Sequence, residues 1–157
     1  MTRIEYLLQN YGSSHQNKLN KLIHWFCIPL ILFTIIGMLM LIPIPFINVS
    51  EIINVGTIIL LLAVIYYIRL SISLTIGFIL VFGMIIIINN WLNDYCISHE
   101  YNTFYALLSI FVLAWIGQFY GHKIEGKKPS FLHDIQYLLV GPMWLLNFIY
   151  KKLNIPT

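Results

Sequence analysis

Three histidines in this chain are each preceded, four positions earlier, by a polar residue. Four residues make about one turn of an α-helix, so each polar residue can orient the imidazole that follows it. Oriented neutral imidazoles are common metal ligands, and they can also move protons. The histidines are His15, His24 and His122, and their polar partners are Tyr11, Asn20 and Gln118, respectively. The spacing therefore predicts a metal or proton-transfer site built from these imidazoles.

Glu125 lies three residues after His122, on the helix face that also carries Gln118. It is the carboxylate nearest to His122 in the sequence, so it is a candidate anionic metal ligand or a partner that orients a ligand. Imidazole with a carboxylate suits non-haem Fe(II), whereas imidazole alone also suits zinc or copper. The alternative is an exposed glutamate paired with Lys127 or Lys128.

His15 and His24 are nine residues apart, which places them on opposite faces of a straight helix. Two arrangements would resolve this conflict. Either the helix bends or unwinds near its start, or only one of the two histidines shares a site with His122.

Other potential ligands are weaker candidates. His99 falls in a predicted outer loop, and His133 follows Pro129 near the start of the last apolar stretch. Cys27 is better interpreted as a small buried hydrophobic residue than as a ligand. It should lie at a different membrane depth from Cys96, so no disulfide is expected.

Composition identifies the elements that must position these residues. Of the 157 residues, 59% are hydrophobic and only 10% are charged, which is more apolar surface than a soluble domain could bury. The net charge of +3 comes from scattered Lys and Arg residues without a basic stripe, so no nucleic-acid partner is expected. The polar leading region, without a small-residue cleavage site, argues against a cleavable signal peptide. The expected partner is the lipid bilayer.

The predicted fold is an all-α integral membrane protein with a single domain over residues 1–157. Four apolar runs are near the length of a membrane span: 22–41, 52–68, 74–88 and 103–120. A short helix over residues 2–10 should begin with a capping box of Thr2 and Glu5, and a second helix should start near His15. The last apolar stretch, 135–150, is interrupted by Gly141-Pro142 and should form an interfacial or re-entrant helix with Trp144 and Tyr150 at the interface.

Charge predicts the orientation, because positively charged loops stay cytoplasmic. The loops 43–51 and 89–102 carry no Lys or Arg, whereas the remaining polar segments carry Arg3, Lys18, Lys21, Arg69, Lys123, Lys127 and Lys128. Both termini should therefore be cytoplasmic, as should the segments that bear the three histidines. A fifth span would place Lys151 and Lys152 outside. The Ile- and Asn-rich composition with short loops favours a bacterial inner membrane. The sequence is compatible with both a monomer and a homo-oligomer.

Several other chemistries lack their motifs. The chain has no Gly-rich phosphate loop, no Gly-x-Ser-x-Gly elbow and no cysteine pair at zinc-ligand spacing. Five histidines are also too few for the clustered boxes of membrane di-iron oxidases. A site for a single metal ion remains.

Two spaced motifs resemble one known family. They read Tyr11-x3-His15-x4-Asn20-x3-His24-x4-Pro29 and Gln118-x2-Gly121-His122-x2-Glu125-x3-Pro129. The chain is similar, from Tyr6 to about Tyr150, to the membrane-embedded Fe(II)-dependent 2-hydroxy fatty acid dioxygenases. One departure is Cys27, where the fungal form is expected to have glycine, and this bears on the packing around His24.

The resemblance implies α-oxidation: a 2-hydroxy fatty acid and O2 yield a fatty acid one carbon shorter, without 2-oxoglutarate. It implies Fe(II) as the cofactor, with His15, His24 and His122 as ligands. The carboxylate and hydroxyl of the acid can chelate such an ion while the acyl tail lies among the spans. Two alternatives are a non-enzymatic lipid-binding or assembly protein with structural histidines, and a His-ligated haem protein.

Overall fold

The computed structural model describes residues 2–13, 15–44, 53–126 and 138–156, and the regular structure in these ranges is α-helical. The helices are α1 (Arg3–Ser13), α2 (Lys18–Met40), α3 (Val55–Ile68), α4 (Ile72–Ser98), α5 (Thr103–Ile124) and α7 (Val140–Lys152). The predicted all-α class is confirmed.

Three of the four predicted spans are long and apolar enough to cross a membrane: α2, α4 and α5. The fourth, α3, is apolar but has only 14 residues. At a rise of 1.5 Å per residue it reaches about 21 Å, which is less than the hydrocarbon core of roughly 30 Å. The first predicted residue of that span, Ile52, lies outside the described residues.

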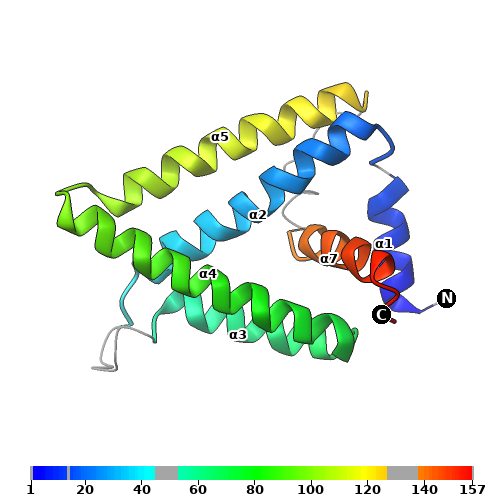
Figure 1. Ribbon diagram of the computed structural model, residues 1–157, viewed down its shortest axis with the longest axis horizontal. Coiled ribbons are helices and arrows are strands. Elements are labelled where there is room, and N and C mark those ends of the chain that lie inside the picture. The colour runs from blue at the N-terminus through cyan, green and yellow to red at the C-terminus, as the bar shows by residue number, and fades with distance from the viewer. Residues whose placement is uncertain (1, 14, 45–52, 127–137, 157) are drawn as a thin grey trace.

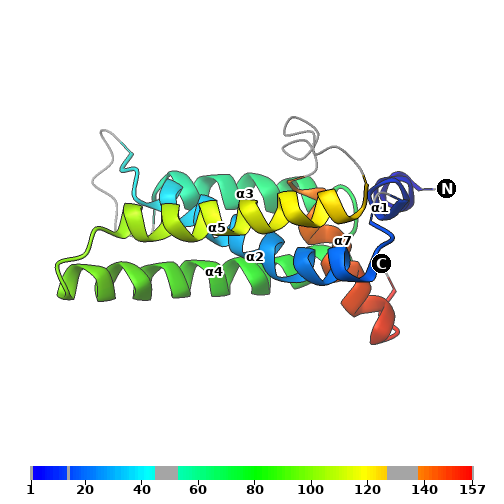
Figure 2. The same cartoon turned by 90° about the horizontal axis from the view of Figure 1, so that it is seen from above.

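Helix α2 is the centre of the arrangement and packs against α3, α4, α5 and α7. Its N-terminal end lies beside the C-terminal end of α5, and it crosses α4 in the view of Figure 1. Helices α1 and α7 pack together at the end of the molecule that carries both termini (Figure 2). The elements that bear the three histidines therefore meet at one end.

Most of the buried apolar side chains form one cluster between α1, α2, α3, α4 and α7. Tyr67 of α3 stacks on Phe78 of α4, with ring centroids 3.8 Å apart. The Tyr67 hydroxyl donates a hydrogen bond of 2.6 Å to the carbonyl of Leu139, the residue before α7. This contact fixes the start of α7 against the bundle.

The predicted span 74–88 is too short. Helix α4 continues to Ser98, through most of the predicted loop 89–102. The polar run that suggested a loop is accommodated within the helix. Asn89 is buried, and its amide donates to the carbonyls of Phe33 (3.2 Å) and Ile85 (3.0 Å). The Thr103 hydroxyl donates to Asn93 Oδ1 (2.9 Å).

The N-terminal helices also differ from their predicted bounds. The capping box is confirmed, because the backbone N–H of Thr2 donates to Glu5 and that of Glu5 donates to the Thr2 hydroxyl. However, α1 runs on to Ser13 instead of ending near residue 10. Helix α2 starts at Lys18 and not near His15, because the Asn17 side chain accepts hydrogen bonds from the first helical N–H groups.

Gly141-Pro142 does not interrupt the last helix but begins it. Helix α7 starts at Val140, so Pro142 lies in the first turn, where a missing N–H costs no helical hydrogen bond. The predicted interfacial residues contact protein: the Tyr150 hydroxyl donates to the carbonyl of Ser73 (2.9 Å), and Trp144 lies against the Tyr11 ring. Residues 135–137 of the predicted stretch, together with Lys127, Lys128, Pro129 and His133, lie outside the described residues.

Candidate metal centre

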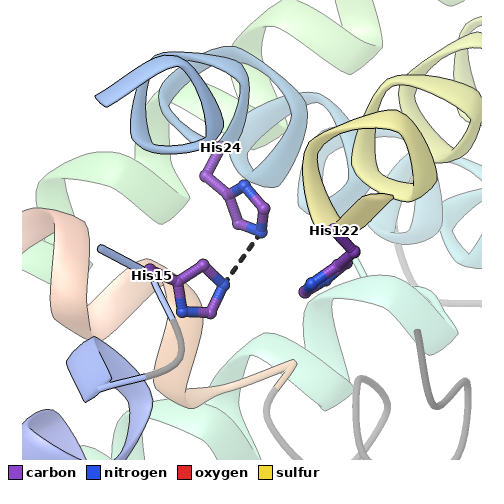
Figure 3. Close-up of side chains that lie close together, drawn as sticks. All are labelled: His15, His24 and His122. Carbon is purple, nitrogen blue, oxygen red and sulfur yellow. Dashed lines mark hydrogen bonds between the residues drawn. The ribbon is translucent and has the colours of Figure 1, made fainter. Parts of the chain in front are cut away.

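The three histidines predicted to share a site come together in space. His15 precedes α2, His24 is in α2, and His122 is in the last turn of α5 (Figure 3). One ring nitrogen from each lies within 4.8 Å of the other two. His15 and His24 are buried, with 3% and 1% of their surfaces exposed, and His122 is partly buried. Their role as ligands stays a prediction, but the geometry needed for it is present.

The conflict between His15 and His24 is resolved by an unwound chain before α2. Because Asn17 caps α2, His15 lies outside the helix, and its backbone N–H donates to the carbonyl of Gly12 (3.1 Å). The chain can therefore turn the His15 ring back toward His24. The two Nε2 atoms lie 3.0 Å apart.

Backbone carbonyls fix the tautomers of this pair. His15 Nδ1 lies 2.7 Å from the carbonyl oxygen of Tyr11, and His24 Nδ1 lies 2.9 Å from that of Asn20. A carbonyl can only accept, so both Nδ1 atoms carry the proton. In the neutral rings both Nε2 lone pairs then face each other at 3.0 Å. Two such lone pairs need a cation or a proton between them.

This donor set fits one metal ion. Two imidazole nitrogens bound to the same ion at roughly 2.1 Å lie about 3.0 to 3.4 Å apart for angles near 90° to 110°. The His15 and His24 Nε2 atoms have that separation, and His122 is close enough to supply a third nitrogen. Three neutral imidazoles suit Fe(II), Zn or Cu and leave coordination positions open.

Two glycines allow α2 and α5 to approach closely enough to form the site. A Cβ at Gly117 would lie 2.7 Å from Cys27 Sγ, and a Cβ at Gly121 would meet Asn20 Oδ1. Small residues four positions apart are a known device for close packing of membrane helices. The packing around His24 thus accommodates Cys27, which lies over Gly117 as a buried free cysteine.

Glu125, the residue that caps the C-terminus of α5, binds the segment around His15. Its carboxylate accepts hydrogen bonds from the backbone N–H groups of Gln16 (2.6 Å) and Asn17 (3.0 Å) and from Asn20 Nδ2 (2.8 Å). Among the described residues it is not part of the three-nitrogen cluster. This geometry favours a residue that orients ligands over one that ligates.

The same contacts affect the ionisation of Glu125. Burial alone would raise its pKa, but the hydrogen bonds from Gln16, Asn20 and Asn17 and the electrostatic influence of His15 outweigh burial. The pKa therefore lies below its usual range, and the carboxylate is ionised at neutral pH.

The predicted polar partners act in different ways. Tyr11 and Asn20 orient their histidines through backbone carbonyls, and the Tyr11 ring also stacks on His15 with centroids 4.3 Å apart. Gln118 is buried and lines a small cavity with His24 and His122. In the described part of the chain, its Oε1 has no hydrogen-bond partner.

That cavity has a volume of about 40 Å³, which is enough for more than one water molecule. Sequence reasoning missed several of the residues around the site: Trp144, whose ring centroid lies 5.8 Å from that of His15, and the cavity residues Ile28, Ile31, Trp115, Leu138, Gly141 and Pro142. In the sequence, the Gly141-Pro142 pair could have indicated this part of the site, because it marks the start of α7. His99 is elsewhere, at the end of α4, with Nδ1 against the carbonyl of Tyr95.

Fold and site together define an α-helical protein with membrane-length helices and a buried three-histidine centre. The model of one protein family, described as 2-hydroxy-palmitic acid dioxygenase Mpo1-like, matches residues 1–153, and the chain belongs to that family. It is 29% identical over 145 residues to the 2-hydroxy-palmitic acid dioxygenase MPO1 of Saccharomyces cerevisiae, an alignment that covers 90% of this chain and 76% of the yeast protein. No solved structure matches the chain. The family resemblance carried by the two histidine motifs is thereby confirmed.

Proposed function

We propose that this protein is an Fe(II)-dependent membrane dioxygenase that converts 2-hydroxy fatty acids and O2 into fatty acids one carbon shorter. The family supports the substrate class, because its description and the yeast relative both refer to a 2-hydroxy acid. The apolar helices support a substrate with a long acyl tail. The observation that carries the proposal is the pair of His15 and His24 Nε2 atoms facing each other 3.0 Å apart beside His122.

His15, His24 and His122 would hold the ion. When bound, Fe(II) would supply coordination positions for O2 and for the hydroxyl and carboxylate oxygens of the acid. The protein's own groups orient and enclose these reactants. The carbonyls of Tyr11 and Asn20 keep the two Nδ1 protons in place, so that both Nε2 atoms remain available.

Gln118 is one polar side chain that lines the small cavity and can contact the substrate there. Its unpartnered Oε1 can accept a hydrogen bond from the 2-hydroxyl group of the acid. The other cavity walls are largely apolar, which limits access of water to the reacting centre. Glu125 contributes from outside the cavity by holding the segment that carries His15.

Metal content and oxygen consumption test this proposal. Detergent-purified protein is loaded anaerobically with Fe(II) and compared with His15→Ala, His24→Ala and His122→Ala; His99→Ala is the matched control. We expect about one iron per chain in the wild type and the control, and loss of iron in the three site variants. We also expect O2 consumption with a 2-hydroxy fatty acid and none with its 3-hydroxy isomer, which forms a less favourable chelate.

Four outcomes contradict the proposal. Wild-type protein that binds no iron, or site variants that bind as much as the wild type, would exclude the three-histidine centre. Folded, metal-free protein that binds lipid would instead favour the non-enzymatic alternative, and a visible haem spectrum would favour a haem protein.

A further inference from the structure

A second and larger cavity lies between α2, α4 and α7, with a volume of about 440 Å³. All the residues that line it are apolar; they include Phe33 of α2, Phe78, Val81, Met84 and Ile88 of α4, and Leu145 of α7. Its volume is typical of a small-molecule site. Because it offers no polar side chain, the groove suits a hydrocarbon.

The groove adjoins the candidate metal centre. Ile28 of α2 and Pro142 of α7 line both the groove and the small cavity that contains His24 and His122. These two residues therefore lie between the small cavity, which contains the histidines, and the apolar groove. A molecule with a polar head and a long apolar tail matches this order.

The α4 wall of the groove lies on the outer surface of the helix bundle. Met84 and Ile88 have 60% and 44% of their surfaces exposed, and Val81 has 36%. At the level of Phe33, α2 and α4 are tied together, because the Asn89 amide donates to the Phe33 carbonyl. Toward the histidines the two helices diverge, and α7 lies between them (Figure 1). The groove is thus open to the bilayer along its side.

We infer that this groove binds the acyl chain of the 2-hydroxy acid, with the head at the histidines, and that Val81, Met84 and Ile88 determine which chain lengths are accepted. The inference rests on the proposed function for the identity of the head group. The assignment of the tail depends on the shared walls Ile28 and Pro142 and on the apolar lining.

Bulky substitutions on the α4 wall test the inference. Val81→Trp and Met84→Trp fill the groove at half-exposed positions, where folding should tolerate them. Leu80→Trp and Ile87→Trp are matched controls, because these residues lie on the same helix, are 67% and 69% exposed and do not line the groove. The measurement is the relative kcat/KM for a series of 2-hydroxy acids of increasing chain length.

We expect the ratio of long-chain to short-chain kcat/KM to fall about tenfold or more in the groove variants, with short-chain rates retained. The controls should keep the wild-type profile. Active groove variants with the wild-type profile would overturn the inference and leave the proposed function intact. Iron-loaded wild type without activity on any 2-hydroxy acid would overturn the proposed function instead.

A binding measurement tests the groove independently of turnover. Trp25 lines it, so a 2-hydroxy acid brominated along its chain should quench Trp25 fluorescence, isolated by comparison with Trp25→Phe. Unlabelled 2-hydroxy acid should relieve the quenching. If a brominated phospholipid quenches Trp25 equally and the 2-hydroxy acid does not displace it, the groove holds bilayer lipid and the inference is wrong.

Discussion

At the scale of single residues, the four-residue spacing predicted that each histidine has a hydrogen-bond partner one helical turn earlier. It did not predict which atom of that partner accepts the hydrogen bond. For His15 and His24 the partner is the backbone carbonyl of Tyr11 or Asn20, which every residue type possesses. The side chains at those positions have other roles: the Tyr11 ring stacks on His15, and the Asn20 amide donates to Glu125. Sequence identifies such side chains, whereas carbonyl contacts depend on where the chain unwinds.

Glu125→Gln tests whether this residue orients ligands. The substitution removes the charge and one of the two acceptor oxygens, so that Gln16, Asn17 and Asn20 lose part of their support. We expect the Fe(II) affinity to fall about 10- to 100-fold, with one iron still bound per chain at saturation. Anaerobic titration with Fe(II) measures this change.

Glu100→Gln is the control, because Glu100 lies in the turn between α4 and α5, outside the described histidine cluster. Wild-type affinity in Glu125→Gln would show that the hydrogen bonds to the His15 segment do not matter for the site. Complete loss of iron at saturation would point to direct ligation by the carboxylate.

At the scale of elements, the apolar runs were predictable and their ends were not. The composition of α4 suggested a loop from residue 89, but Asn89 finds carbonyl acceptors on α2 and α4, which only the packed bundle supplies. The start of α2 depends on the Asn17 side chain. Gly117 and Gly121 carried a recognisable spacing for close helix packing, and this signal was available in the sequence.

Gly121→Ala tests whether the site requires close packing of α5 against α2. Alanine also has a higher helix propensity than glycine, and a control substitution must account for that effect. The added Cβ would meet Asn20 Oδ1, so α5 must move away from α2 and carry His122 with it. We expect weaker Fe(II) binding and a lower thermal midpoint, both measured on detergent-purified protein.

The matched control is Gly83→Ala in α4, where a Cβ would meet nothing within 4 Å. There the alanine should stabilise the protein by about 0.4–1 kcal/mol by restricting the unfolded chain. Equal effects of the two substitutions would mean that the α2–α5 contact does not limit the site.

At the scale of the whole molecule, α3 returns the chain from the far end of α2 to the end where α4 begins, so both termini lie on the side of the histidines (Figure 1). This side also carries the Lys and Arg residues of the described chain, whereas Asp94 and Glu100 lie near the other end, in the last turns of α4 and just after it. The charge pattern of the sequence and the path of the helices therefore agree. Helix α3 brings the chain back to the side of the histidines, although it is too short to be identified as a membrane span from its length.

Cysteine labelling tests the proposed orientation. In a background with Cys27→Ala and Cys96→Ala, single cysteines replace Thr2, Tyr101 or Ile155, which are all exposed. We expect a membrane-impermeant reagent to label position 101 in intact cells, and positions 2 and 155 only in inverted membranes. Labelling of positions 2 and 101 from the same side would refute the topology.

The lateral opening of the groove beside Met84 has a kinetic consequence. A substrate that enters from the bilayer is present at a concentration counted per lipid molecule, not per volume of water. Each added methylene favours partition into the membrane by about 0.8 kcal/mol, before any contact with the protein. A preference for long chains measured against the total concentration of acid therefore combines partition with fit, and only comparison at equal mole fraction in the membrane separates the two.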